Sequence, residues 1–322
     1  MSTNAQTLPS RRWFSKAWLM EQKSLIALLV LIVIVSTLSP NFFTLNNLFN
    51  ILQQTSVNAI MAVGMTLVIL TSGIDLSVGS LLALTGAVAA SIVGFEVNAL
   101  VAVVGALALG AAIGGVTGVI IAKGRVQAFI ATLVMMLLLR GVTMVYTDGS
   151  PISTGFTDNA DLFGWFGIGR PLGIPTPVWI MALVFLTAWY VLHHTRLGRY
   201  IYALGGNEAA TRLSGISVDK IKIIVYSLCG LLAALAGVIE VARLSSAQPT
   251  AGTGYELDAI AAVVLGGTSL SGGKGRVIGT LIGALILGFL NNGLNLLGVS
   301  SYYQMIVKAV VILLAVLVDN KK

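Results

Sequence analysis

The residues best placed for a specific contact lie in one polar stretch, 193–222. In chain order they are Glu208, Ala209, Ala210, Arg212 and Gly215. A carboxylate near a helix N-terminus interacts favourably with the helix dipole, and a glycine permits a tight exit from a helix. We therefore predict that Glu208 and Gly215 hold a short segment on which a soluble partner docks. An ordinary solvated loop is the alternative interpretation.

Two other polar stretches interrupt apolar sequence, at 71–80 and, as its expected counterpart, at 265–275. Irregular backbone at membrane depth persists only where protein or a water-filled cavity satisfies its polar groups. Both stretches are therefore predicted to line or gate a route for a neutral polyol. Asp75 either caps a helix that starts near Leu76 or orders the inner mouth of the route, and the two roles are compatible. The residues assigned to the route are Ser72, Gly73, Asp75, Ser77, Thr268 and Ser269.

Catalytic and metal chemistry is not expected. A phosphate-binding loop would need glycine where Thr268 stands and serine or threonine where Gly275 stands, so no ATP site is predicted. His193 and His194 are adjacent and cannot face one metal ion from one side of a helix. The sequence shows no nucleophile constellation and no basic, aromatic-studded face, so neither catalysis nor nucleic-acid binding is predicted.

The composition indicates the elements that must position these residues. Of 322 residues, 57% are hydrophobic and 10% are charged, whereas soluble domains carry about 25% charged residues. The sequence predicts an all-α, polytopic inner-membrane protein with about ten transmembrane helices. The expected spans are 19–38, 57–70, 76–93, 99–122, 126–146, 177–192, 223–241, 257–265, 277–297 and 302–318.

Lysine and arginine placement predicts the orientation. With both termini in the cytosol, the inner segments hold 15 of the 19 basic residues. The predicted organisation is a cytosolic tail, 1–18, followed by one transmembrane domain, 19–322, with an inner loop at 193–222 and an outer loop at 147–176. The aromatic residues of the outer loop indicate either an interface belt or a platform for an extracytoplasmic partner. They are Phe156, Phe163, Trp165 and Phe166.

Two spans share a glycine spacing that permits close helix packing. Its members are Gly110, Gly114, Gly118, Gly275, Gly279 and Gly283. The 165-residue offset covers five spans, so the two halves would be inverted relative to each other, as in many transporters. The same offset aligns Asp75 with Glu240. Chance is the alternative explanation, because small-residue spacing is common in membrane helices.

Residues 207–215, Asn-Glu-Ala-Ala-Thr-Arg-Leu-Ser-Gly, resemble the EAA motif of ABC importer permeases. They depart from it in having four residues between the alanine pair and Gly215, and no Leu-Pro follows. Together with 73–79 and 266–275, the motif is similar to the monosaccharide-importer branch of that family over essentially the whole chain. The resemblance implies a homodimeric membrane core, a cytosolic ATPase that binds ATP and Mg, and a periplasmic sugar-binding protein. It implies D-ribose as the expected sugar, although no side chain here is specific for it.

The main rival is an ion-coupled secondary sugar transporter. Such proteins keep ionisable relays in mid-membrane. Here the candidates are Asp75, Arg140, Glu240 and Lys308, all expected near span ends. A passive channel or scaffold is a further alternative, but it would not need an inner docking segment.

Overall fold

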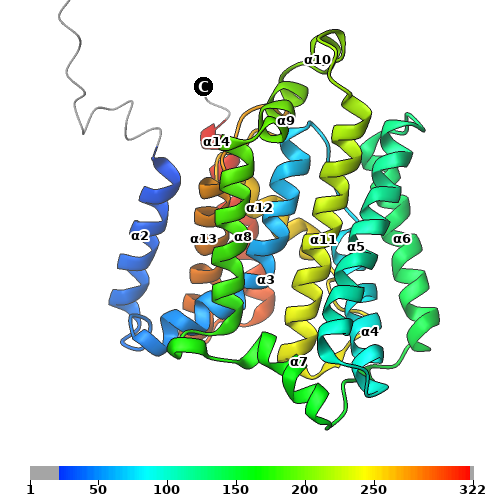
Figure 1. The fold of residues 1–322 in the computed structure, drawn as a ribbon. Helices are drawn as coiled ribbons and strands as arrows, with labels where there is room; N and C mark the ends of the chain where they lie inside the picture. The colour runs from blue at the N-terminus through cyan, green and yellow to red at the C-terminus, as the bar shows by residue number, and fades with distance from the viewer. Residues whose placement is uncertain (1–21, 320–322) are drawn as a thin grey trace, which may run out of the picture.

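The computed structural model describes residues 22–319, so the predicted tail, 1–18, and the start of the first predicted span lie outside the described residues. The described chain is a bundle of roughly parallel and antiparallel helices (Figure 1). Its long elements are α2 (Lys23–Leu38), α3 (Leu45–Leu70), α4 (Val78–Gly94), α5 (Ala99–Ala122), α6 (Ala128–Thr147), α8 (Thr176–His194), α11 (Val218–Leu244), α13 (Val277–Leu296) and α14 (Ser301–Asp319). The short ones are β1 (Ile152–Ser153), α7 (Asp158–Ile168), η1 (Pro171–Gly173), α9 (Arg196–Gly206), α10 (Glu208–Leu213), β2 (Ser246–Ala247) and α12 (Tyr255–Leu265).

Each predicted span corresponds to a helix, but not all of these helices are long enough to cross a membrane. Among the described residues, seven helices have the length and apolar composition to do so: α3, α5, α6, α8, α11, α13 and α14. Helices α2 and α4 are apolar but shorter, and α12 has 11 residues. Eleven residues extend about 16 Å, against a hydrocarbon core of about 30 Å. The all-α membrane class is thus confirmed.

The outer loop is more ordered than the sequence suggested. It contains α7, and β1 pairs antiparallel with β2. Phe163 on α7 is fully buried, so it is not part of an exposed aromatic surface, whereas Phe156 is fully exposed. The predicted aromatic platform is therefore wrong for Phe163, because α7 turns this ring against the bundle.

Helix α11 is the centre of the bundle, with α3 on one side and α5 on the other (Figure 1). Glycines allow its close approach to α5: a Cβ on Gly110 would lie 2.6 Å from the carbonyl oxygen of Gly230. A Cβ on Gly114 would collide with the backbone of Tyr226, and one on Gly118 would lie 2.8 Å from the Cα of Ile223. The second glycine set lies where α13 meets α12 and the turn after it. A Cβ on Gly275 would collide with Thr268, one on Gly279 with Gly266, and one on Gly283 with Ala262.

Two non-helical segments enter the bundle from opposite ends. Residues 71–77 follow α3 and lead into α4, and residues 248–254 lead into α12. The second segment meets the first turn of α4, where a Cβ on either Gly79 or Gly252 would collide with the carbonyl oxygen of the other. Protein groups satisfy their backbone: Tyr226 donates to the Ile74 carbonyl at 3.3 Å, and Arg140 donates to the carbonyls of Pro249 and Ala251 at 3.0 and 2.6 Å.

The expected pairing of 71–80 with 265–275 as inverted counterparts is wrong. Ser72 Oγ lies 2.7 Å from the carbonyl oxygen of Ser271, and the Gly273 amide donates to the Leu70 carbonyl at 2.9 Å. The two stretches therefore share one end of the molecule, whereas inverted counterparts would lie at opposite ends. The segment that enters from the other end is 248–254.

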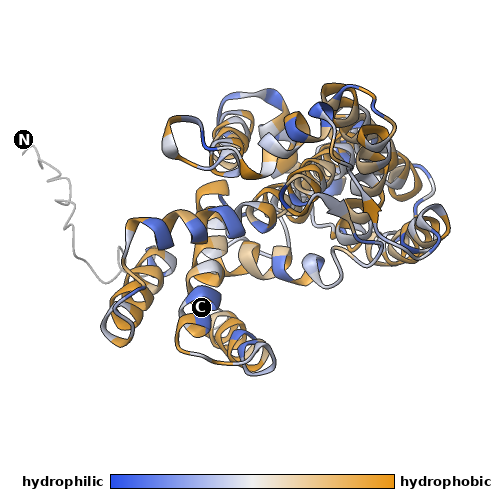
Figure 2. Ribbon diagram, turned by 90° about the horizontal axis from the view of Figure 1, so that it is seen from below, coloured by the Kyte–Doolittle hydropathy of each residue, from blue (hydrophilic) through white to orange (hydrophobic). Residues whose placement is uncertain are grey.

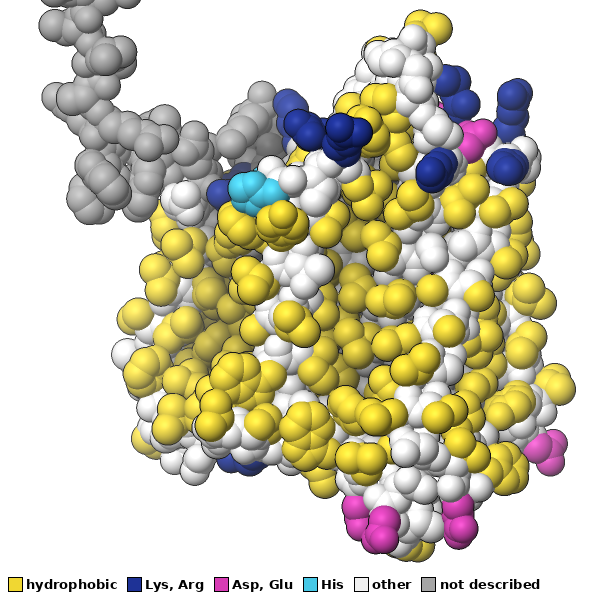
Figure 3. Space-filling view, in the orientation of Figure 1, with side chains coloured by type: hydrophobic (Ala, Val, Ile, Leu, Met, Phe, Trp, Pro, Cys, Tyr) yellow, Lys and Arg dark blue, Asp and Glu magenta, His cyan; other side chains and the backbone are white. Residues whose placement is uncertain are grey.

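Charge and apolar surface are separated along the bundle. Figure 3 shows Lys and Arg side chains gathered at the end that carries α9 and α10, most of the visible Asp and Glu at the α7 end, and an apolar band between. Viewed from the α7 end, Figure 2 shows hydrophobic residues on all the long helices. Exposed leucines such as Leu137, Leu186 and Leu313 make an outer surface that suits lipid.

Gly114→Ala should destabilise the protein by about 1–3 kcal/mol, because the new methyl group collides with α11 backbone that cannot move independently. Gly115→Ala is the matched control: its Cβ would lie 3.9 Å from Ser227 Oγ, and it gains the same helix propensity. The measurement is the temperature at which half of the detergent-solubilised protein is lost from the monodisperse peak. Equal midpoints for the two variants would contradict the packing assigned to α5 and α11.

Candidate functional site

The predicted docking segment folds as two helices, α9 and α10, at the basic end of the bundle (Figures 1 and 3). Asn207 caps α10 by accepting a hydrogen bond from the Ala210 amide at 2.9 Å, so Glu208 is the first helical residue. Gly215 leaves the helix with φ +86°, a conformation that favours glycine. Ala209 and Ala210 are exposed, and the Leu213 side chain is 88% exposed. The segment thus presents a small apolar surface to its surroundings.

An ion-pair network braces this segment against α11. Lys222 Nζ lies 3.0 Å from a Glu208 carboxylate oxygen, and Arg212 lies 3.4 Å from the same oxygen and 3.3 Å from Asp219. About half of the Glu208 and Arg212 side chains is exposed, so solvent screening limits what these pairs add to stability. The network therefore orients α10 more than it stabilises the fold.

Helix α9 touches both polar stretches that the sequence assigned to a gate. Tyr202 donates to the Gly275 carbonyl at 2.6 Å, and burial raises the pKa of this phenol, with Arg276 opposing, so it remains a neutral donor. Ser72 is held at φ +66°. Its single hydroxyl proton is donated to the Ser271 carbonyl at 2.7 Å, which is closer than the Gly205 carbonyl at 3.2 Å. A Cβ on Gly205 would collide with the Leu70 carbonyl. One junction therefore joins α9 to residues 70–73 and 271–275.

A hollow of about 660 Å³ opens at this junction. It brings together predicted route residues, Ser72 and Gly73, and predicted docking residues, Glu208 and Arg212, beside Tyr226. The residues that line the hollow suggest no catalytic mechanism. The arrangement places α9 and α10 next to residues 70–73, and α9 also next to residues 271–275.

Four of the predicted route residues lie elsewhere. Asp75 is 1% exposed and accepts a hydrogen bond from the Ser77 amide at 3.0 Å. Helix α4 begins at Val78 with Ser77 in the N-cap position, so the prediction that Asp75 caps a helix starting near Leu76 is wrong. Thr268 is buried, and Ser269 closes a turn by donating its amide to the Lys274 carbonyl at 2.9 Å. Their roles in a gate stay predictions.

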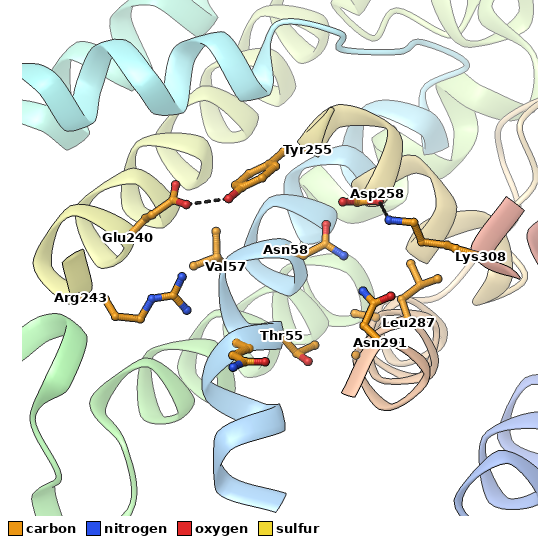
Figure 4. Close-up of a pocket in the computed structure, with 13 residues that line it drawn as sticks. Thr55, Val57, Asn58, Glu240, Arg243, Tyr255, Asp258, Leu287, Asn291 and Lys308 are labelled. Carbon is orange, nitrogen blue, oxygen red and sulfur yellow. Dashed lines mark hydrogen bonds and ion pairs between the residues drawn. The ribbon is translucent and has the colours of Figure 1, made fainter. Parts of the chain in front are cut away.

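A second site, which sequence reasoning missed, is a cavity of about 190 Å³ between α3, α11, α12, α13 and α14 (Figure 4). Tyr255 donates to a Glu240 oxygen at 2.6 Å, and Lys308 contacts Asp258 at 2.8 Å. The lining residues labelled in the figure are Thr55, Val57, Asn58, Glu240, Arg243, Tyr255, Asp258, Leu287, Asn291 and Lys308.

This cavity was missed because its polar residues are scattered over five helices. A usable signal was present in the polar residues before position 57, such as Gln54 and Thr55, which were excluded from the predicted span. Helix α3 instead starts at Leu45 and turns Thr55 into the bundle, while Gln54 lies at the exposed rim of the cavity. Glu240 and Lys308 were considered only as relays near span ends, yet Glu240 is 7% exposed.

The comparisons agree with this architecture. The family profile described as "Branched-chain amino acid transport system / permease component" matches residues 47–316, so the chain belongs to this family of permease components. The chain is 91% identical over 317 residues to the ribose import permease protein RbsC of Escherichia coli (strain K12), covering 98% of this chain and 99% of the relative. RbsC of Haemophilus influenzae is 68% identical, covering 94% of both chains.

A more distant relative is the D-allose transport system permease protein AlsC of Escherichia coli (strain K12), 41% identical over 91% of this chain and 89% of the relative. No solved structure matches the chain. The family confirms the predicted class, a membrane permease subunit rather than an enzyme.

Gly205→Ala should release α9 from the junction, because its methyl group would collide with the Leu70 carbonyl despite alanine's better helix propensity. Gly206→Ala is the matched control, since its Cβ would meet nothing within 4 Å. We expect trypsin to cleave at Arg199 and Arg212 several-fold faster in Gly205→Ala than in the parent, and at the parental rate in Gly206→Ala. Equal cleavage in the two variants would contradict the junction.

Proposed function

We propose that this protein is the membrane-spanning permease subunit of an ATP-driven importer of a monosaccharide, with D-ribose as the first sugar to test. The observation that carries the proposal is the junction through which α9 contacts residues 70–73 and 271–275. A passive channel has no need for such a linkage to an inner docking segment. The choice of ribose is supported by the printed names of the relatives that are 91% and 68% identical.

The partners follow from an import system of this type. A cytosolic ABC ATPase, which binds ATP and Mg, would dock on α10, where Ala209, Ala210 and Leu213 are exposed. A periplasmic sugar-binding protein would dock at the opposite end, near α7. A second copy of the chain would complete the core within the bacterial inner membrane, surrounded by lipid. No cofactor and no nucleic acid is expected on this chain.

We also propose ten membrane-crossing elements, with both termini in the cytosol and an inverted repeat. The starts of α3 and α11 are 173 residues apart (218 minus 45), as are those of α6 and α14 (301 minus 128). Helix α11 packs on α4 and α5, and α3 packs correspondingly on α12 and α13. With this spacing in place of the 165-residue offset, Asp75 and Glu240 no longer occupy equivalent positions in the two halves. Segment 248–254 and α12 together would make one crossing.

The proposed mechanism uses these contacts in sequence. ATP binding closes the ATPase and displaces α10, which the ion pairs to Lys222 and Asp219 connect to α11. The junction at Tyr202 and Ser72 passes the displacement to residues 70–73 and 271–275 at the inner end. The route then alternates between outward and inward access. This subunit contributes motion and a route, while ATP hydrolysis occurs in the partner.

The complex of this chain with its ATPase and binding protein should import D-ribose into liposomes only when ATP and the binding protein are both present. Radiolabelled ribose uptake measures this directly. Uptake that persists without ATP would contradict the proposal. Uptake that collapses with an uncoupler while ATP is constant would favour the ion-coupled secondary transporter.

Glu208→Lys should reduce sugar-stimulated ATPase activity at least about 10-fold, because it places a third cation beside Lys222 and Arg212. Glu208→Gln, which removes the ion pairs without repulsion, should lose less than about 3-fold. Co-purification with the ATPase and stimulated ATP turnover measure the two effects. Unchanged coupling in Glu208→Lys would remove Glu208 from the docking role, and partial rescue by Lys222→Glu would support the ion pair.

A further inference from the structure

Three polar atoms at the cavity between α3 and α11–α14 have no hydrogen-bond partner among the described residues. They are Thr55 Oγ1, Asn58 Oδ1 and Glu240 Oε2. Thr55 is 5% exposed and Glu240 is 7% exposed, so water does not freely satisfy them. A buried polar atom without a partner is costly, and most such atoms in proteins are bonded. Unpaired polar atoms that converge on one cavity indicate that a ligand completes their bonding.

The chemistry of these atoms restricts the ligand. The Asn58 amide oxygen and the Glu240 carboxylate oxygen accept hydrogen bonds only, and the Thr55 hydroxyl accepts and donates. A suitable ligand must therefore offer several donors at close spacing. Hydroxyl groups on neighbouring carbons of a polyol do so, and they can also accept from Arg243 and Asn291, which line the same cavity.

The charge of the lining argues for a neutral ligand. Two carboxylates, Glu240 and Asp258, lie with two cations, Arg243 and Lys308, around the same cavity. Asp258 and Lys308 already neutralise each other at 2.8 Å. A cation would meet Arg243 and Lys308, and an anion would meet Glu240, so each would be repelled at short range in a site of low dielectric. A neutral molecule avoids both costs.

We propose that this cavity is a sugar-binding station within the transport route. There, Thr55, Asn58 and Glu240 accept hydrogen bonds from the hydroxyl groups of one monosaccharide. The inference rests on the proposed function, which it extends by assigning the site and the residues. Its volume of about 190 Å³ suits a single monosaccharide and not a disaccharide.

The surroundings connect the station to segment 248–254. Glu240 also lines a second cavity of about 200 Å³, bounded by α4 and residues 246–251. Segment 248–254 is held by Arg140 and leads directly to Tyr255, which fixes one oxygen of Glu240. A shift of this segment would therefore reorient Glu240 and change how the sugar is held.

The first test is transport by the complete complex carrying Thr55→Val, Asn58→Leu or Glu240→Gln. Each should lower ribose uptake per ATP hydrolysed about 10-fold, the size expected for losing one buried hydrogen bond to substrate. Thr187→Val is the control for an equivalent change on α8, since Thr187 is exposed and its hydroxyl bonds its own helix at Leu183. Parental uptake in all three cavity variants, or an equal loss in Thr187→Val, would overturn the assignment.

The second test does not require transport. Cys229 is the single cysteine of this chain and is buried, so a small thiol reagent can report on Val57→Cys in the same complex, because Val57 lines the cavity but offers no hydrogen bond to the sugar. Millimolar D-ribose should slow this labelling at least about 3-fold, and sucrose should not, because a disaccharide exceeds the cavity. Labelling unaffected by ribose would overturn the station. If the parent complex fails to import ribose, the proposed function fails, whereas ribose protection would still support the site.

Discussion

The structure depends on one constraint: within lipid, every backbone amide and carbonyl must find its partner inside the protein. Two non-helical segments, 71–77 and 248–254, enter the bundle, and the second meets the first turn of α4 where Gly252 approaches Gly79. Neither glycine could carry a side chain, because each approaches the other's carbonyl oxygen. Tyr226 and Arg140 satisfy carbonyls of the two segments, so the irregular backbone is tolerated at depth.

Helix α11 connects the two functional regions. Near its start, Lys222 and Tyr226 contact α10 and the first irregular segment, and near its end Glu240 lines the polar cavity. Its close fit to α5, without side chains at Gly110, Gly114 and Gly118, makes this pair behave as one rigid body. Under the proposed function, force applied at α10 would reach the cavity along this helix and through segment 248–254. No long chain of small side-chain movements is required.

The charges inside the bundle distinguish the proposed mechanism from its rival. An ion-coupled transporter needs a carboxylate that exchanges its proton or cation during transport. Here Glu240 is held by Tyr255 beside Arg243, Asp258 is paired with Lys308, and Asp75 is enclosed by its bonds to Ser77. Under the proposed function, these carboxylates shape a neutral binding site and a turn, and the energy comes from a partner. At this cavity, Asp258 is paired with Lys308, whereas one oxygen of Glu240 has no partner among the described residues.

The sequence by itself determined the membrane class and the approximate helices, and it singled out the polar segment that folds as α9 and α10. Lipid imposes long apolar runs, and a charged segment such as 193–222 cannot lie within them. The structure places Glu208 and Gly215 at the two ends of α10, as their types suggested. Only the tertiary structure decided which polar stretches are neighbours: Ser72 contacts Ser271, whereas segment 248–254 enters from the opposite end. Only it assembled the cavity, because Thr55, Glu240 and Lys308 are separated by up to 253 positions (308 minus 55) and sequence periodicity carries no information about contacts between helices.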